Sequence, residues 1–259
     1  NPALIPNLLA MLSGYPPSSL VANPYATSAM VRNVTEYFDA LLSYPYSEDL
    51  LVGEALGHAG GALTGIPLTS EHIIAHSRHP FIASIRPRLS LSGVETEATA
   101  TMVWNCLSGS SRLPAFWNAF PFHPHPVGNP HGNRKPTPAE ALFGVRVLDL
   151  VIRILTPRRV FALGRVAEAT LSAYFAHRSA PYIRHPSNGG HPEFLSGMTA
   201  NNIILPMTPQ QKAESLGIKF EKVAPGYLNL CIRTGSQLLA SGHVSDRKGK
   251  LGADLSVEQ

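Results

Sequence analysis

The sequence predicts an α/β fold in which a mostly parallel, four-stranded sheet is covered by helices on both faces. Three observations lead to this prediction: four short apolar runs, helical patterns between them, and a glycine or polar turn at the end of each run. Short apolar runs that alternate with helices are typical of strands buried in a parallel sheet. We expect one domain over residues 1–259, with N-terminal helices in 1–46, a core in 47–200 and a C-terminal part in 201–259.

The predicted elements follow one another in a regular order. Helices come first, and the apolar spacing of Met30, Val34, Phe38 and Leu41 indicates an amphipathic helix over residues 27–44. The strands, each with the loop that follows it, are expected at residues 49–57, 115–122, 158–164 and 180–190, with helices at 141–155 and 165–177.

The composition narrows the class of protein. With 44% hydrophobic and 15% charged residues in a chain of 259, the sequence is not that of a disordered protein. The net charge of +4 and the pI of about 9.2 favour an anionic partner. Cys106 and Cys231, the only two cysteines, cannot form a four-thiolate zinc or iron–sulfur site within one chain.

Location and processing are also indicated by the sequence. No apolar run approaches the roughly 20 residues that span a bilayer, so we expect no membrane partner. The start lacks the charged and apolar regions of a signal peptide, and two cysteines do not suggest a secreted disulfide scaffold. We therefore expect a cytoplasmic monomer. Because Asn1 is not an initiator methionine, we expect its start to have been truncated or processed.

Three polar stretches follow the carboxyl ends of predicted strands. They are GEALGHAGGALTGIPLTSE (53–71), NAFPFHPHPVGNPHGNR (118–134) and RHPSNGG (184–190). In open parallel sheets, ligands bind in the crevice beyond the carboxyl ends of the strands. We therefore expect these three stretches to converge on one site, although they are far apart in the sequence.

Each stretch allows a functional and a purely structural interpretation. The glycines of 53–71 either expose backbone N–H groups to an anion or form a flexible loop. His185, at a strand end, either donates a hydrogen bond to charge developing on a substrate oxygen or is a surface turn residue. Asn118 interrupts an apolar strand, and its amide either pairs with nearby backbone or reads the polar edge of a planar ligand.

The histidines of the proline-rich stretch suggest a metal site at first sight. His123, His125 and His131 could supply two or three nitrogen ligands. No carboxylate nearby completes the set, since Glu140 is expected on the next helix. We interpret the stretch as a stiff rim and expect no metal.

In their order, GEALGHAGGALTGIPLTSE, FWNAFPFHPHPVGNPHGNRKPT and HPSNGG resemble the three motifs of the uracil-DNA glycosylase superfamily. The proline loop and GNRKPTPAE are similar to the branch whose first motif is GEAPG. The resemblance implies a three-layer αβα sandwich and a monofunctional enzyme of base-excision repair. Such an enzyme flips uracil out of single- or double-stranded DNA and hydrolyses its N-glycosidic bond, here on the DNA of the bacterial nucleoid. That branch commonly holds an iron–sulfur cluster, which two cysteines cannot supply, so no cofactor is expected.

The resemblance also implies roles for residues in the pocket. Asn118 matches the asparagine that bonds the polar edge of uracil, and His185 matches the histidine that stabilises the departing uracil anion. Gly53, Glu54 and Ala55 match the turn that holds the sugar and the attacking water. His185 and Glu54 are therefore the expected catalytic residues.

For DNA, the resemblance implies a loop that enters the minor groove and a set of backbone contacts. Ser187, Asn188 and Gly189 match that loop. The residues expected to contact the DNA backbone are Thr69, Ser70, Arg134, Lys135, Arg184 and Ser187.

The chain departs from the family at several positions. Ala55 stands where other branches carry an Asp or Asn that orients water, so Glu54, a backbone carbonyl or His58 must take that role. Leu68 replaces the aromatic residue that stacks on uracil, and Phe120 or Phe122 is the substitute. His58 stands where some branches carry a tyrosine that excludes the thymine methyl.

These departures leave three alternatives open. The same fold could act on another lesion, such as hypoxanthine or a mismatched base. A catalytically weak protein that binds damaged or abasic DNA is the second alternative, and a histidine-rich metal hydrolase is the third.

Overall fold

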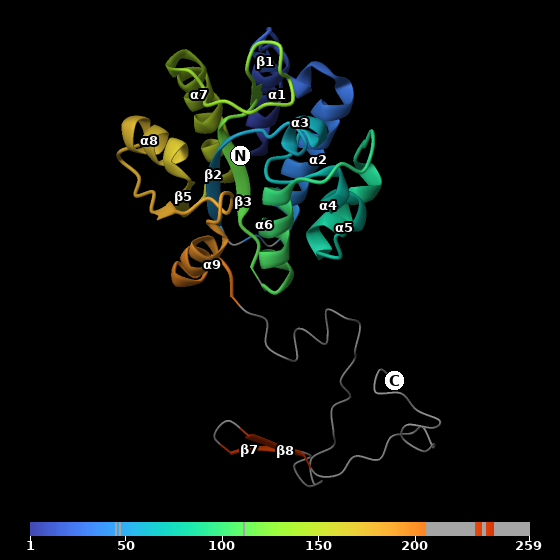
Figure 1. Cartoon of the computed structure of the whole chain (residues 1–259), viewed down its shortest axis with the longest axis vertical. Coiled ribbons are helices and arrows are strands. Elements are labelled where there is room, and N and C mark those ends of the chain that lie inside the picture. Colours follow the sequence, from blue (N-terminus) through green and yellow to red (C-terminus); the bar gives the residue numbers. More distant parts are fainter. Residues whose placement is uncertain (45, 47, 111, 206–230, 235–236, 241–259) are drawn as a thin grey trace. The chain divides into compact units, whose positions relative to one another are not determined.

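The computed structural model shows the chain as two compact units, Asn1–Lys212 and Ala213–Gln259 (Figure 1). In the second unit, β7 (Cys231–Thr234) pairs antiparallel with β8 (Gln237–Ala240). That the whole chain forms one domain stays a prediction. The residues that the structure describes are 1–44, 46, 48–110, 112–205, 231–234 and 237–240.

A four-stranded parallel sheet lies at the centre of the first unit. Its strand order is β3-β2-β5-β6, and each neighbouring pair is parallel. The strands are β2 (Asp49–Ala55), β3 (Ala115–Phe120), β5 (Arg159–Leu163) and β6 (Tyr182–Ile183). All four lie in the runs that the sequence predicts, so the predicted sheet is confirmed.

The helices predicted from apolar spacing are confirmed as α2 (Ser28–Ser43), α7 (Pro138–Leu155) and α8 (Arg165–Tyr174). The sequence prediction starts α7 three residues too late. The helix begins earlier because Thr137 and Glu140 form a capping box: the Glu140 N–H donates to the Thr137 hydroxyl, and the Thr137 N–H donates to the Glu140 carboxylate.

Several short elements were not predicted individually, apart from the N-terminal helices expected in residues 1–46. Five of the described ones lie between β2 and β3, where no long helical periodicity marks them. The remaining elements are η1 (Pro2–Leu4), α1 (Ile5–Ser13), β1 (Val21–Ala22), η2 (Pro24–Ala26), α3 (Gly61–Thr64), α4 (Glu71–His76), α5 (Pro80–Ile85), η3 (Arg86–Arg88), α6 (Ala98–Ser108), β4 (His123–Pro124) and α9 (His191–Ala200).

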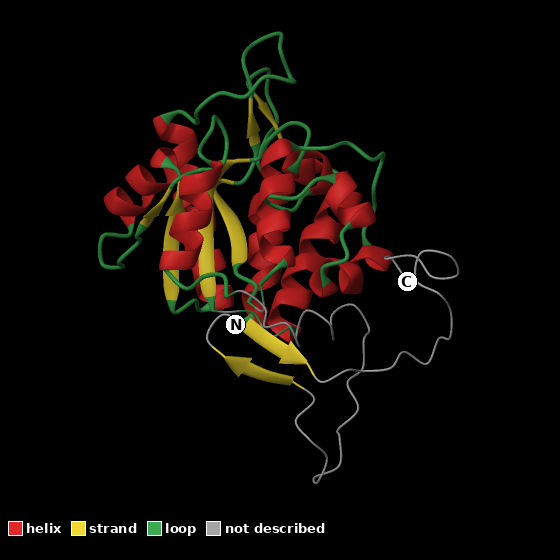
Figure 2. Ribbon diagram, turned by 60° about the horizontal axis from the view of Figure 1, so that its bottom comes forward, coloured by secondary structure: helices red, strands yellow, loops and turns green. Residues whose placement is uncertain are grey.

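Helices cover both faces of the sheet, as Figure 2 shows. α7 packs on β3, and α8 packs on β5 and β2. Because β3 is an edge strand, one side of its backbone has no strand partner. The Tyr37 hydroxyl of α2 fills part of this edge: it accepts from the Phe116 N–H (2.8 Å) and donates to the Phe116 carbonyl (3.0 Å). This arrangement fixes β3 and therefore the position of Asn118 on it.

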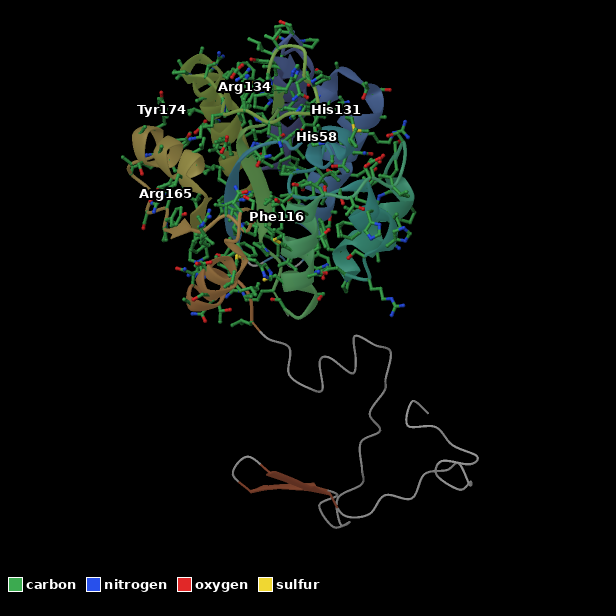
Figure 3. All side chains as sticks on the ribbon, in the orientation of Figure 1. His58, Phe116, His131, Arg134, Arg165 and Tyr174 are labelled. Atoms are coloured by element: carbon green, nitrogen blue, oxygen red, sulfur yellow. The ribbon has the colours of Figure 1, made fainter. Side chains whose placement is uncertain are left out.

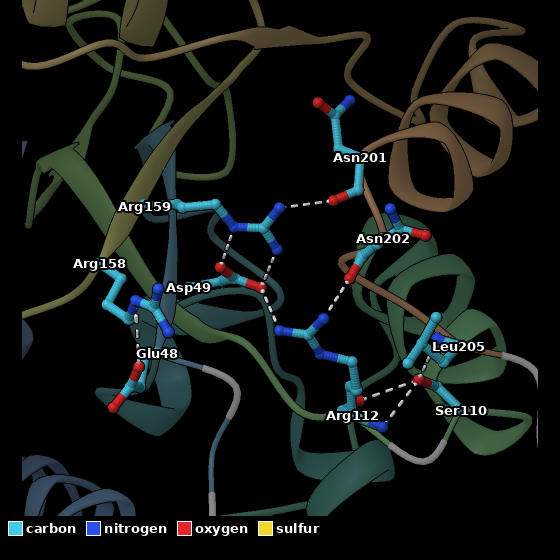
Figure 4. A network of polar contacts seen from close by, with 9 residues as sticks. All are labelled: Glu48, Asp49, Ser110, Arg112, Arg158, Arg159, Asn201, Asn202 and Leu205. Carbon is cyan, nitrogen blue, oxygen red and sulfur yellow. Dashed lines mark hydrogen bonds and ion pairs between the residues drawn. The ribbon is translucent and has the colours of Figure 1, made fainter.

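An ion-pair network joins the amino ends of β2 and β5 (Figure 4). Both carboxylate oxygens of the buried Asp49 accept from the Arg159 guanidinium at 2.7 Å, and Arg112 lies at 3.3 Å. Arg159 also donates to the Asn201 carbonyl (2.7 Å), and Arg112 donates to the Asn202 carbonyl (2.8 Å). The network therefore ties the end of α9 to the sheet, at the strand ends opposite to those expected to carry the site.

We expect Asp49→Asn to lower the free energy of unfolding by about 3–5 kcal/mol, because it leaves two arginines without their shared buried carboxylate. Urea titration followed by circular dichroism measures this change. Glu48→Gln is the matched control, since the exposed pair of Glu48 and Arg158 at 3.7 Å contributes about 0–1 kcal/mol. Equal losses in the two variants would contradict the structural role of Asp49.

His79 makes the stability of the fold depend on pH. Its Nδ1 accepts from the Phe81 N–H (3.2 Å) at the start of α5, and burial lowers its pKa to about 4. Between pH 6.5 and about 4 the unfolded chain binds a proton at His79 that the folded chain does not, so unfolding becomes easier as the pH falls. We expect a loss of about 3 kcal/mol over this range.

The variant His79→Asn tests this expectation, because asparagine keeps a cap acceptor but does not titrate. Its unfolding free energy should fall less than that of the wild type between pH 6.5 and pH 4. The unfolding free energies are measured by urea titration at several pH values. If they fall equally with pH in the variant and the wild type, the assignment to His79 is contradicted.

In the part of the chain that the structure describes, no helix is long and apolar enough to cross a bilayer.

Candidate functional site

The three polar stretches line one pocket of about 410 Å³, so their predicted convergence is confirmed. The pocket lies where β2 and β6 end, because Ala55 closes β2 and His185 follows β6 by two residues. Of the predicted site residues, it brings together Glu54, Ala55, Leu68, Arg134, His185, Ser187 and Asn188. It also includes Leu56, Gly57, Gly61, Glu97, Thr99, Pro124 and Asn133, which the sequence analysis did not assign.

His185 has a defined tautomer in this pocket. The Ser187 backbone N–H donates to His185 Nδ1 (3.2 Å), and the Ser187 hydroxyl contacts the same nitrogen at 2.8 Å. Since Nδ1 accepts, a neutral His185 carries its proton on Nε2. Burial, and next the Arg184 charge, lower the pKa of His185 and favour the neutral ring. Among the described residues, Nε2 has no hydrogen-bond partner and remains a donor for a ligand.

Asn118 lies beside Gly53 in the register of β3 and β2 and is only 2% exposed. It is not one of the residues that line the pocket. A Cβ added at Gly53 would lie 2.6 Å from Asn118 Oδ1, so the glycine leaves the room that this amide occupies. No described residue hydrogen-bonds the amide, and its nitrogen and oxygen are not among the fully buried side-chain atoms that lack a partner. The amide is therefore available to a ligand that reaches it.

Leu68 forms an apolar part of the pocket wall. Its φ of 53° is in the left-handed region, which is uncommon for leucine. The Trp104 indole N–H of α6 donates to the Leu68 carbonyl (3.0 Å) and holds this conformation. A leucine can contact a base through its apolar atoms but cannot stack on it as an aromatic ring does.

The expected contacts of Thr69 and Ser70 with phosphate need correction. Both residues are completely buried. The Thr69 hydroxyl donates to the Ile66 carbonyl (2.7 Å) and lies 3.1 Å from the Thr64 hydroxyl. The Ser70 hydroxyl accepts from the Ile73 N–H and caps α4. The structure therefore assigns both hydroxyls to the fold of the loop.

Arg134 lines the pocket, but its guanidinium is fully engaged. It forms two bonds with the Glu140 carboxylate, at 2.6 and 2.7 Å. Its other bonds go to the carbonyls of His125, Lys135 and Leu20. Since an arginine has five N–H donors, no donor is left for a phosphate in this arrangement. Arg134 thus joins the proline loop to the start of α7, and its predicted contact with DNA would require these bonds to break.

The other predicted DNA contacts are more accessible. Lys135, Asn188 and Gly189 are exposed, and Arg184 is half-buried. Asn188 and Gly189 both have positive φ angles, 53° and 76°, and form a tight turn beyond His185. The Arg184 guanidinium donates to the Asn188 carbonyl at 3.5 Å. Their roles toward DNA stay predictions.

The histidines of the proline loop are largely structural. His123 is buried, with Nδ1 2.9 Å from the Leu56 carbonyl and Nε2 2.9 Å from the Pro130 carbonyl. His125 is buried as well, whereas His131 is exposed and its ring lies 5.7 Å from that of His58 (Figure 3). No described group of three His, Cys, Asp or Glu side chains is arranged to hold a metal ion.

Three further predicted contacts lie outside the pocket lining. Gly53 is buried against Asn118, and His58 lies between the rings of His123 and His131. Phe120 is completely buried in an aromatic cluster with Tyr15 and Phe122. Phe120 and Phe122 therefore belong to the core, where the Phe122 ring stacks on that of Tyr15 and lies 5.9 Å from that of Phe143 on α7. The expectation that one of them stacks on the base is corrected.

Two carboxylates line the pocket. Burial raises the pKa of Glu54, and the Lys135 charge partly opposes this shift. Glu97, immediately before α6, was missed by the sequence analysis, and burial raises its pKa too. The Ala100 N–H donates to Glu97 Oε2 (3.1 Å) and fixes the side chain at the start of the helix. An acidic residue directly before an apolar helical run is the signal that points to such a cap.

A larger hollow of about 590 Å³ lies between α1, α7 and the end of α8. None of the residues predicted for the site lines it. The smaller pocket at the carboxyl ends of the strands is therefore the candidate active site.

Comparisons with known proteins establish the fold. No family model matches the sequence, and no curated protein matches it. Among solved structures, the crystal structure of SMUG2 from Pedobacter heparinus is similar, with a TM-score of 0.55 and 16% sequence identity. The match covers 77% of this chain and 98% of the SMUG2 chain. The protein therefore has a uracil-DNA glycosylase-like fold.

Proposed function

We propose that the protein is a monofunctional DNA glycosylase that releases uracil from DNA and leaves an abasic site. The observation that carries this proposal is His185, whose Nε2–H has no described partner and whose side chain lines the pocket. Its place at the carboxyl end of a parallel strand is where ligands bind in such sheets. The similar fold of SMUG2, which is a DNA glycosylase, supports the same reaction class.

The chemistry fits a neutral histidine donor. When the N-glycosidic bond breaks, its electron pair moves to the base, and the base carries negative charge on its carbonyl oxygens. A donor fixed beforehand in a half-buried pocket stabilises that charge with little rearrangement. A neutral His185 donates from Nε2 because Nδ1 is occupied by Ser187.

DNA binding is proposed to use the exposed groups around the pocket. Lys135 and Arg184 are the cations beside it that can approach phosphates, and Asn188 and Gly189 form the turn that can fill the space of a flipped base. Phosphate contacts of this kind weaken as salt rises. We further propose that the protein acts as a monomer on bacterial DNA in the cytoplasm.

A second candidate is the release of a different damaged base, such as hypoxanthine. The observation that favours it is Leu68, which offers an apolar wall without the stacking surface of an aromatic ring. A pocket with less stacking depends more on hydrogen bonds to the edge of the base, which differ between uracil and hypoxanthine.

The experiment is a gel assay of strand cleavage at abasic sites after incubation with duplexes that carry one uracil, one hypoxanthine or one thymine mismatch. Selective cleavage at uracil supports the first candidate, and selective cleavage at hypoxanthine supports the second. Tight binding of abasic DNA without release of any base would contradict both and indicate a damage-binding protein.

A further inference from the structure

The pocket contains a carboxylate in a position that the motif resemblance does not assign. By the motif resemblance, Ala55 stands where other branches carry an Asp or Asn that orients water, and the alanine side chain has no polar atom for that role. Glu97 lines the same pocket but comes from the segment before α6, which is separate from the three motif stretches. Glu97 is therefore the carboxylate of the pocket that lies outside the three motif stretches.

The glycine-rich loop is shaped around the Glu97 carboxylate. A Cβ at Gly60 would lie 2.8 Å from Glu97 Oε2, and a Cβ at Gly57 would lie 3.5 Å from Oε1. Both glycines therefore leave room for the side chain to enter the pocket. The loop amides at Gly60 and Ala62 donate to the Gly57 carbonyl, so they are not directed at a bound anion.

Glu97 is held firmly but is not neutralised. Oε2 accepts from the Ala100 N–H at 3.1 Å, at the start of α6. No described cation forms an ion pair with it, in contrast to Asp49 and Glu140, which pair with arginines. A carboxylate without a cation partner in a half-buried site has a raised pKa, which makes it a better proton acceptor.

Glu54, the other carboxylate of the pocket, is less well placed to replace the missing group. It precedes Ala55 at the end of β2, and successive side chains of a strand point to opposite sides. Its side chain therefore cannot take the direction of the Ala55 side chain. Lys135 also acts on Glu54 and lowers its proton affinity.

We propose that Glu97 is the general base that orients and deprotonates the attacking water, an inference that rests on the proposed glycosylase function. The bond between the base and C1′ of the deoxyribose breaks, and its electron pair leaves with the base anion, which His185 stabilises. The water oxygen bonds to C1′, and its proton passes to the Glu97 carboxylate. That proton then passes to the base anion, directly or through solvent, which gives a neutral base and an abasic site.

The test is a single-turnover measurement with excess full-length protein on the duplex that the wild type cleaves. Glu97→Gln keeps an oxygen that can accept from the Ala100 N–H but cannot take a proton from water. We expect its rate constant to fall on the order of 10²-fold. Its affinity for an uncleavable duplex with 2′-fluorodeoxyuridine should change less than about threefold, because ground-state binding is retained.

Two further variants separate chemistry from structure. Glu97→Ala should be slow, and added formate should restore part of its rate, because a small carboxylate can occupy the vacated space. Glu95→Gln, an exposed change on the same segment, should leave the rate unchanged. Thermal melting of each variant checks that it folds.

The outcomes distinguish the two proposals. If the wild type releases uracil but Glu97→Gln retains its rate, or if formate does not restore Glu97→Ala, the role of Glu97 is overturned while the glycosylase function stands. A larger loss in Glu54→Gln than in Glu97→Gln assigns the base to Glu54 instead. A wild type that releases no base from any of the three duplexes overturns both proposals.

Discussion

His185→Ala is expected to slow release of the base by about 10²–10³-fold under single-turnover conditions, with little change in DNA affinity. This is the loss in rate that typically follows when one hydrogen-bond donor aimed at charge developing in the transition state is removed. Affinity should be retained because the bond from Nε2 strengthens only when the base becomes an anion. Rapid-quench kinetics and fluorescence anisotropy with an uncleavable duplex measure the two quantities separately.

Two controls make the His185 prediction specific. Ser187→Ala removes the hydroxyl near Nδ1 but keeps the backbone N–H that sets the tautomer, so its loss should be smaller, about tenfold or less. His72→Ala changes an exposed histidine of α4 and should have no effect. If His185→Ala weakens DNA binding as much as it slows release, His185 acts in binding rather than in stabilising the leaving base.

The architecture could be predicted because it follows from features spread over many residues. The runs that became β2, β3 and β5 are long enough and apolar enough to indicate buried strands. Parallel strands bring their carboxyl ends to the same edge of a sheet, so the convergence of three distant stretches followed from the strand assignment alone.

What could not be predicted depends on single hydrogen bonds. α4, α5 and α6 are short or weakly periodic, and each is started by one side chain: Ser70, His79 and Glu97, respectively. A polar residue directly before a helical segment can indicate a cap, but the sequence does not show which pocket its side chain lines. This is why Glu97 was not assigned to the pocket.

Arg134 and Thr69 were predicted to contact DNA, but the structure uses both side chains within the fold. Their residue types suit a phosphate contact, and the motif places them near the site. The structure pairs Arg134 with Glu140, six residues later, and buries Thr69 against the Ile66 carbonyl. Whether a cation or hydroxyl is used within the fold depends on which backbone groups surround it, and that is a tertiary property.

Asn118→Asp is expected to reduce release of uracil by about 10³-fold or more. The asparagine amide offers an N–H donor and a carbonyl acceptor, which match the O4 and N3–H of uracil. An ionised aspartate has no donor and places negative charge against O4. A site built to hydrogen-bond a group of its substrate rejects an analogue without that group by a factor of about 10⁴–10⁵ in the strongest cases. The measurement is the single-turnover rate on uracil, hypoxanthine and thymine-mismatch duplexes.

Gly53→Ala tests the same contact without changing Asn118. The added Cβ would meet Asn118 Oδ1 at 2.6 Å, so the amide must move out of its position beside β2. We expect the rate of uracil release to fall, as in Asn118→Asp, while the affinity for abasic DNA is retained. Because Asn118 is not part of the present pocket lining, this result would also show that the pocket deepens toward Gly53 when a base enters. If both variants keep the wild-type rate and base preference, the amide without a described partner is only a feature of the core, and base recognition must come from the residues around His185.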